Sequence, residues 1–134
     1  MTLLDVDRRT LRLFVLPDLV AILAFVFVGE LQHGMLGFDA ARPLRFLAVA
    51  APFLIGWAIA GPVLGAYGAS ARTARGLLGW SVLAWVGADV LAQVLLATGA
   101  FPEVVDPIFF VVAGVFGGVF LLVARGIAWF VVEA

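Results

Sequence analysis

Four polar side chains of this sequence have types and spacings suited to binding a cation or a proton. Asp89 and Gln93 are four residues apart, and Glu30 and His33 are three residues apart. On a helix, side chains three or four positions apart lie on the same face. We therefore expect the four residues to converge into one polar cluster, although Glu30 and His33 also suit the wet end of a helix.

A second pairing is predicted between Asp18 and Arg125. Asp18 lies near the start of the first apolar stretch, and Arg125 lies near the end of the last one. If the two ends lie on the same side of the protein, the opposite charges meet. We expect this pair to be structural. Because Asp18 follows Pro17, it also suits the start of a helix.

The residue sets typical of an enzyme active site are absent from the sequence. It contains no G-x-S-x-G, no H-E-x-x-H and no P-loop, and Ser70 and Ser81 have no neighbouring base. His33 is the only histidine and there is no cysteine, so a spaced set of metal ligands is missing. We expect no catalysis, no metal site and no cofactor.

The composition determines where these polar residues must sit. Hydrophobic residues make up 65% of the 134 residues and charged residues 13%, against about 45–50% and about 25% in soluble domains. A domain of this size leaves too much surface exposed to hide that excess from water. This excludes a water-soluble enzyme, a nucleic-acid-binding domain and a disordered tail. An integral membrane protein, with the lipid bilayer as its partner, remains.

Four segments are long and apolar enough to cross a bilayer, which takes about 20 residues. They cover approximately residues 13–32, 46–67, 76–98 and 108–132. The short connections favour antiparallel neighbours. We therefore predict an all-α membrane protein with four transmembrane helices in an up-down bundle, forming a single domain over residues 1–134.

The arginines predict the orientation of the bundle. Cytoplasmic ends of membrane helices carry an excess of basic residues. Six arginines belong to the side that holds both termini, and two, Arg42 and Arg45, belong to the other side. The six are Arg8, Arg9, Arg12, Arg72, Arg75 and Arg125. Both termini are therefore expected in the cytoplasm, with the protein in the plasma membrane.

Aromatic residues are predicted to serve two purposes. Tyr67, Trp80 and Trp129 fall near the expected cytoplasmic interface, where aromatic belts occur. Trp57 and Trp85 fall nearer the middle of the membrane, so they are expected to be packing residues or the walls of a pocket.

Glycines in the second and fourth spans follow the G-x-x-x-G pattern, which lets helices approach closely in lipid. The pattern occurs at Gly61 and Gly65 and again at Gly114 and Gly118. It is explained either by intramolecular packing of these spans or by the seam of a homodimer. The pattern leaves both open.

A series of landmarks connects these segments. Asp18 opens the first span and Gly29-Glu-Leu-Gln-His33 closes it, Pro52-Phe-Leu-Ile-Gly-Trp57 lies in the second, and Trp80 opens the third. From about Asp18 to Trp129 the chain resembles a small family of four-span membrane proteins, catalogued as a domain of unknown function and found mainly in haloarchaea and actinobacteria. The resemblance implies a four-span fold and carries no activity.

Two classes of function remain. The first is a small oligomeric transporter or channel in which Asp89 and Glu30 bind a cation or proton, because intramembrane ionisable residues mark such pathways. Four spans enclose little interior, so this function requires a homodimer. The alternative is a non-catalytic accessory or structural subunit that binds a lipid, a pigment or a larger membrane complex. The sequence identifies no particular substrate.

Overall fold

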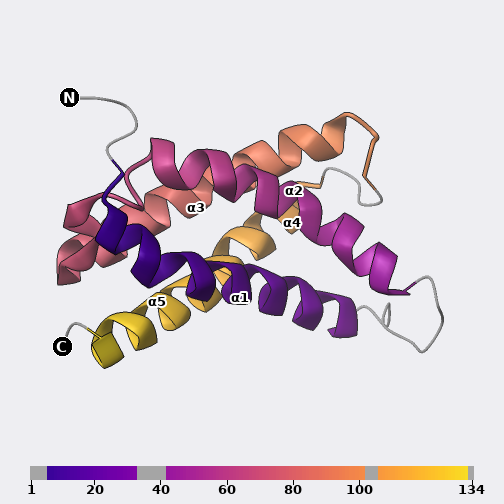
Figure 1. The fold of residues 1–134 in the computed structure, drawn as a ribbon. Helices are drawn as coiled ribbons and strands as arrows, with labels where there is room; N and C mark the ends of the chain where they lie inside the picture. The colour runs from indigo at the N-terminus through magenta and orange to yellow at the C-terminus, as the bar shows by residue number, and fades with distance from the viewer. Residues whose placement is uncertain (1–5, 33–41, 102–105, 133–134) are drawn as a thin grey trace.

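The computed structural model describes residues 6–32, 42–101 and 106–132, and over these residues the chain is helical without strands (Figure 1). The first three spans are the helices α1 (Arg8–Gln32), α2 (Arg42–Val63) and α3 (Ala74–Ala97), with the short 3-10 helix η1 (Ala69–Arg72) between the last two. The fourth span consists of α4 (Pro107–Val112), the π-helical turn η2 (Ala113–Gly117) and α5 (Gly118–Val132). All four spans are long and apolar enough to cross a membrane, which confirms the predicted fold class.

Three span boundaries differ from the prediction by four or five residues: α1 begins at Arg8, and α2 begins at Arg42 and ends at Val63. Two of these differences have a local cause. The first helix begins at Arg8 because Asp7 caps it: the Asp7 carboxylate accepts hydrogen bonds from the Thr10 backbone N–H and hydroxyl at 3.0 and 2.8 Å. The second helix ends at Val63, four residues before the predicted end at Tyr67. Gly65 follows with a φ of +87°, a conformation that favours glycine and turns the chain out of the helix.

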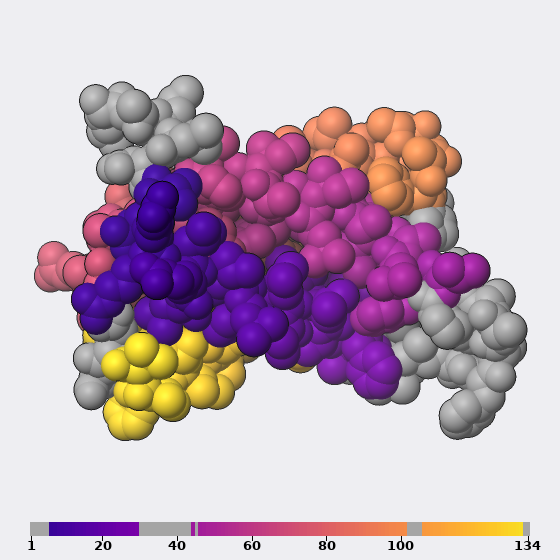
Figure 2. All heavy atoms as spheres, in the orientation of Figure 1, coloured from indigo at the N-terminus to yellow at the C-terminus, as the bar shows by residue number. Residues whose placement is uncertain are grey.

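Successive spans run antiparallel, so three segments meet at one end of the bundle. There the Asp7 backbone N–H donates to the Tyr67 carbonyl oxygen at 2.8 Å, and Trp129 Nε1 donates to the Arg72 carbonyl oxygen at 2.8 Å. We call this the terminal end. Helix α1 packs against α5, and α2 packs against α3. Figure 2 shows the start of α1 beside the C-terminal part of α5.

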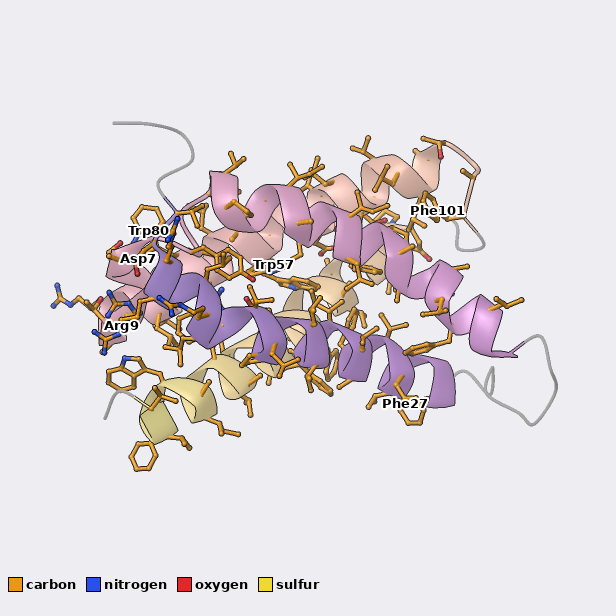
Figure 3. The ribbon with its side chains drawn as sticks, viewed as in Figure 1. Asp7, Arg9, Phe27, Trp57, Trp80 and Phe101 are labelled. Atoms are coloured by element: carbon orange, nitrogen blue, oxygen red, sulfur yellow. The ribbon has the colours of Figure 1, made fainter. Side chains whose placement is uncertain are left out.

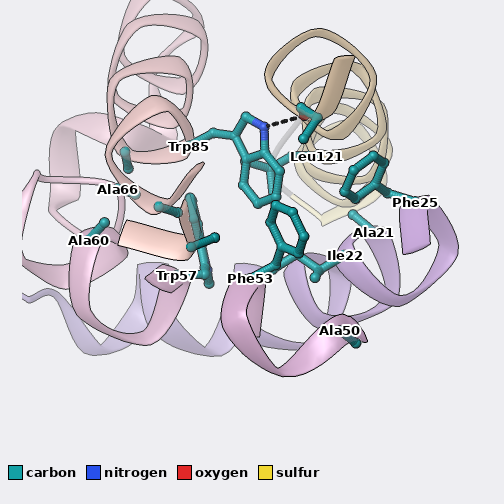
Figure 4. Close-up of a cluster of buried hydrophobic side chains, with 14 of the residues drawn as sticks. Ala21, Ile22, Phe25, Ala50, Phe53, Trp57, Ala60, Ala66, Trp85 and Leu121 are labelled. Carbon is teal, nitrogen blue, oxygen red and sulfur yellow. Dashed lines mark hydrogen bonds between the residues drawn. The ribbon is translucent and has the colours of Figure 1, made fainter. Parts of the chain in front are cut away.

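The middle of the bundle is filled by aromatic rings. Phe53 stacks on Trp85 with a centroid distance of 6.0 Å, and Phe25 meets both rings edge-on (Figure 4). Trp57 lies 6.2 Å from Trp85, and the two tryptophans are 4% and 1% exposed. Aromatic pairs of this kind contribute about 0.5–1.5 kcal/mol each beyond their burial. Of the two predicted roles, packing residue or pocket wall, Trp57 and Trp85 therefore have the first.

Glycines of the second and fourth spans provide the space for these rings. A Cβ atom at Gly61 would lie 2.9 Å from the Tyr67 ring, one at Gly65 2.8 Å from Trp80, and one at Gly117 2.2 Å from Trp85. Within the predicted pattern, Gly61, Gly65 and Gly118 face aromatic rings of their own chain, and Gly114 faces Asp89. The intramolecular explanation therefore accounts for these glycines, although their partners are side chains rather than the glycines of the other span. The homodimer stays a prediction.

Candidate functional site

Two centres of buried polar side chains lie at different depths in the bundle. Asp18 lies about 15 Å along α1 from the terminal end, and Asp89 lies about 22 Å along α3 from the same end, at about 1.5 Å per residue. A bilayer core is about 30 Å thick. Asp18 therefore belongs to the middle of the bundle, and Asp89 lies toward the end opposite the termini.

The first centre is the predicted pair of Asp18 and Arg125, which the structure contains. Arg125 Nε donates to Asp18 Oδ1 at 2.7 Å, and Arg125 Nη2 donates to Asp18 Oδ2 at 2.8 Å. Both side chains are completely buried. Two parallel hydrogen bonds between a guanidinium and a carboxylate are the strongest form of this interaction.

Two further donors of Arg125 are used as well. Its Nη1 atom donates to the Ala66 carbonyl oxygen and to Ser81 Oγ, both at 3.0 Å. The Phe14 ring lies 4.3 Å from the guanidinium carbon, within the range of a cation–π contact. Arg125 is therefore bound by side chains or backbone from the first and third spans and from the connection after the second.

Tyr67 completes this centre, and its predicted role in an interfacial aromatic belt is wrong. Its side chain is buried, its hydroxyl donates to Asp18 Oδ2, and Trp57 Nε1 donates to the Tyr67 hydroxyl oxygen at 2.8 Å. The reason is the early end of α2: the turn at Gly65 directs the chain back over the bundle. We call Asp18, Arg125, Tyr67, Ser81 and Trp57 the ion-pair network.

Sequence spacing predicts no polar role for Tyr67, Ser81 or Trp57. One signal was available for Ser81. It lies seven residues into α3, near the same end of the bundle as the buried Arg125. No comparable signal identifies Tyr67, because a tyrosine at the end of an apolar segment is typical of the membrane interface.

The second centre contains Asp89 and Gln93, which lie on one face of α3 as predicted. Gln93 Nε2 donates to Asp89 Oδ1 across 3.4 Å, a long hydrogen bond. Asp89 is 1% exposed, yet its Oδ2 atom has no hydrogen-bond partner, and neither does Gln93 Oε1. A buried acceptor without a partner costs about 1–3 kcal/mol. We call this pair the Asp89 site.

The π-helical turn of the fourth span faces the Asp89 site. A Cβ atom at Gly114 would lie 3.2 Å from Asp89 Oδ2, so the glycine leaves room for the carboxylate. One turn away on α3, Trp85 Nε1 donates to the Ala113 carbonyl oxygen at 3.0 Å (dashed in Figure 4). Single π-helical turns occur frequently at functional sites.

The other half of the predicted cluster lies beyond what the structure describes. Glu30 belongs to α1, but its side chain is outside the described residues, and so is His33. Of the predicted four, the structure brings Asp89 and Gln93 together. Within residues 6–32, 42–101 and 106–132 there is no group of three His, Cys, Asp or Glu side chains that could hold a metal ion.

Comparison with known proteins places this architecture in a family. The DUF3054 family, described as proteins of unknown function, matches residues 15–128. The chain belongs to the DUF3054 family. The matched region of this DUF3054 member includes the ion-pair network and the Asp89 site. No curated protein and no solved structure matches the chain.

Proposed function

We propose that this multi-pass membrane protein carries a proton or a small cation across the membrane and that Asp89 is the residue that binds it. The observation that supports the proposal is the unpartnered Oδ2 atom of a carboxyl that is 1% exposed. Ionisable residues inside membrane segments are costly, by about 2.5–3.5 kcal/mol at a helix centre, and usually mark ion or proton pathways.

The contrast with Asp18 strengthens this proposal. Asp18 is equally buried, but its carboxylate accepts hydrogen bonds from Arg125 and Tyr67, so its burial has a structural explanation. Among the described residues, Asp89 has Gln93 as its one hydrogen-bond partner, at 3.4 Å. A carboxyl that the fold buries without satisfying is available for a ligand.

A homo-oligomer is part of the proposal. The middle of one bundle is filled by the rings of Phe25, Phe53, Trp57 and Trp85, so we place the path between subunits. Gly61, Gly117 and Gly118 face rings of their own chain. We therefore propose that subunits associate through the exposed apolar face of the fourth span, which includes Val111, Val115, Val119 and Val123.

The proposed orientation places the terminal end in the cytoplasm and the protein in the plasma membrane. The exposed arginines of this end are Arg8, Arg9, Arg12 and Arg75. Asp7 lies among them and is paired with Arg72. Figure 3 shows Asp7, Arg9 and Trp80 at this end and Phe27 and Phe101 toward the other. A basic end with interfacial tryptophans favours the cytoplasmic side.

The experiment is ion flux into vesicles that contain the purified protein. With an imposed proton gradient, the wild type is expected to carry current or acidify the lumen, and Asp89→Asn is expected to abolish the flux. Asp106→Asn is the matched control, because it makes the same substitution at an exposed residue that caps α4. Asparagine is also a good helix cap, so this variant is expected to fold normally. Equal flux from wild type and Asp89→Asn, or silence from both, contradicts the proposal.

The accessory-subunit alternative has one observation in its favour. The fourth span is the least buried of the four, and its Val and Phe side chains are uncovered in the single chain. Another membrane helix is a suitable partner for such a face. In that case, purification in a mild detergent brings down a stoichiometric partner, and the isolated protein moves no ions.

A further inference from the structure

We infer that the ligand of the Asp89 site is a proton and that Gln93 is built to hydrogen-bond both the ionised and the protonated carboxyl. The inference deepens the proposed function by naming the substrate of the same site. It concerns the chemical state of Asp89, so it can be measured in a protein that shows no transport.

The number of oxygen ligands favours a proton over a metal ion. The Asp89 site offers three side-chain oxygens, namely Asp89 Oδ1, Asp89 Oδ2 and Gln93 Oε1. Calcium takes about six to eight oxygens, and magnesium takes about six in an octahedron. Two described neighbours supply no further side-chain oxygen: Trp85 contributes an N–H donor that is already bound to the Ala113 carbonyl oxygen, and Gly114 has no side chain.

Other charges do not satisfy the carboxyl either. Phe25 of α1 contacts Trp85 of α3, and the described charged groups of α1 are Arg8, Arg9 and Arg12 at the terminal end and Asp18, which binds Arg125. The other elements packed against α3 are α2, η1, α4, η2 and α5. Their described charged groups are engaged elsewhere: Arg125 of α5 binds Asp18, Arg72 of η1 binds Asp7, and Asp106 caps α4. Within the described residues, the Asp89 carboxyl has its one hydrogen bond from Gln93. A carboxylate buried without an opposite charge takes up a proton rather than remain ionised.

Binding of a proton gives the Asp89–Gln93 pair a hydrogen-bond donor that it lacks when Asp89 is ionised. An ionised carboxylate is an acceptor only, and the site then contains two unpartnered acceptors, Asp89 Oδ2 and Gln93 Oε1. When one proton binds, an O–H bond forms on the carboxyl and no electrons are transferred. The carboxyl becomes a donor, and an amide oxygen four residues away on the same face is a suitable acceptor.

Gln93 can serve both states by turning its side-chain amide through a half-turn. In the structure Nε2 donates to Oδ1 at 3.4 Å, the arrangement that suits an ionised carboxylate. With Asp89 protonated, the turned amide places its oxygen where the nitrogen was, and that oxygen accepts the new O–H. Both orientations have the same shape, so the packing around the amide is unchanged. Leucine has a similar volume and neither group, which makes Gln93→Leu the diagnostic variant.

The test is infrared spectroscopy of the protein in phosphatidylglycerol vesicles, which separates a carboxylic acid from a carboxylate. At neutral pH we expect an acid C=O band that Asp89→Asn removes and that Asp106→Asn retains. Gln93→Leu is expected to shift this band to higher frequency, because the acid loses its acceptor. If Asp89→Asn fails to fold, the Gln93→Leu shift assigns the band in its place. The band is expected to keep its intensity when sodium, magnesium or calcium chloride is added at constant pH.

Two results would overturn the inference. One is the absence of an acid band at every pH at which the protein stays folded. The other is loss of the band on addition of one of these salts at constant pH, which shows that a metal ion displaces the proton. A band that behaves as expected in a protein without flux contradicts the proposed transport and supports proton binding, so the two failures are distinguishable.

Discussion

Arg125 binds both carboxylate oxygens of Asp18, at 2.7 and 2.8 Å, with both side chains completely buried. The two residues are 107 positions apart, and their contact connects the first span to the last. The first and last spans are far apart in the sequence. Lipid tails cannot form charged hydrogen bonds, so this pair joins the two spans specifically. It also gives both carboxylate oxygens of Asp18 a partner, which separates its role from that of Asp89.

Removing one partner of this pair is expected to destabilise the protein strongly. Asp18→Asn leaves the charge of Arg125 buried without its counterion, which costs about 3–5 kcal/mol in comparable pairs. The double variant Asp18→Leu with Arg125→Met removes both charges and is expected to be more stable than Asp18→Asn. Unfolding in mixed micelles by a denaturing detergent measures both. If the double variant is less stable than Asp18→Asn, the two side chains do not serve mainly to neutralise each other's charge.

The Tyr67 hydroxyl is expected to matter although it carries no charge. Tyr67→Phe removes the hydrogen bond to Asp18 and leaves Trp57 Nε1 without its acceptor. A buried donor without a partner costs about 1–3 kcal/mol. The control is Thr98→Val, which removes an exposed hydroxyl bound to the Leu95 carbonyl and is expected to change stability by less than about 0.5 kcal/mol. Equal effects from the two variants would show that Tyr67 is dispensable.

The sequence was sufficient to predict the fold class and one of the two polar centres. Hydropathy identifies spans because a bilayer demands long apolar helices. The pairing of Asp18 with Arg125 followed from their positions at corresponding ends of the first and last spans. Both predictions depend on distance along a helix, which sequence spacing measures directly.

Features that depend on tertiary packing were not predictable. The role of Tyr67 depends on the turn at Gly65, which is visible in its φ of +87° and not in its hydropathy. The π-helical turn at Ala113–Gly117 depends on Trp85, whose indole fills the space over Gly117. The contact of Asp89 with Gly114 follows from the same packing. Gly65 and Gly114 belong to the predicted glycine pattern, but their partners Trp80 and Asp89 lie on another segment.

Gly117 is expected to be essential to the packing of the fourth span. In Gly117→Ala the new Cβ atom would lie 2.2 Å from Trp85 Cζ2, and overpacking of this kind costs about 1–3 kcal/mol. Gly126→Ala is the control in the same span, because nothing lies within 4 Å of its Cβ position. Thermal unfolding is expected to show a lower melting temperature for Gly117→Ala and no decrease for Gly126→Ala. A decrease of similar size in both would point to a general effect of glycine loss.

The N-terminal cap is expected to make stability fall in acid. Hydrogen bonds from the Thr10 backbone N–H and hydroxyl, together with Arg72, lower the pKa of Asp7 below its ordinary value of 3.8. A carboxyl with a lowered pKa in the folded state stabilises the protein above the unfolded pKa, and this contribution is lost as pH falls through the folded value. The melting temperature of the wild type should therefore fall below about pH 4 more steeply than that of Asp7→Asn. Parallel curves for the two proteins would assign the acid sensitivity to other groups.

Asp89→Asn is expected to leave stability unchanged or to raise it, unlike the same substitution at Asp18. The two aspartates are 1% and 0% exposed, so burial alone predicts equal losses. Their partners differ. Asparagine at position 18 breaks a bond to a buried guanidinium. Asparagine at position 89 replaces a carboxyl that has no basic partner among the described residues, and it brings an amide donor beside the unpartnered Gln93 Oε1. A carboxyl retained at the expense of stability is expected where function requires it, as is common for functional sites.

Detergent unfolding of both variants under one condition measures the difference, which we expect to be at least about 3 kcal/mol. Equal destabilisation would show that Asp89, like Asp18, is held in the bundle for structure.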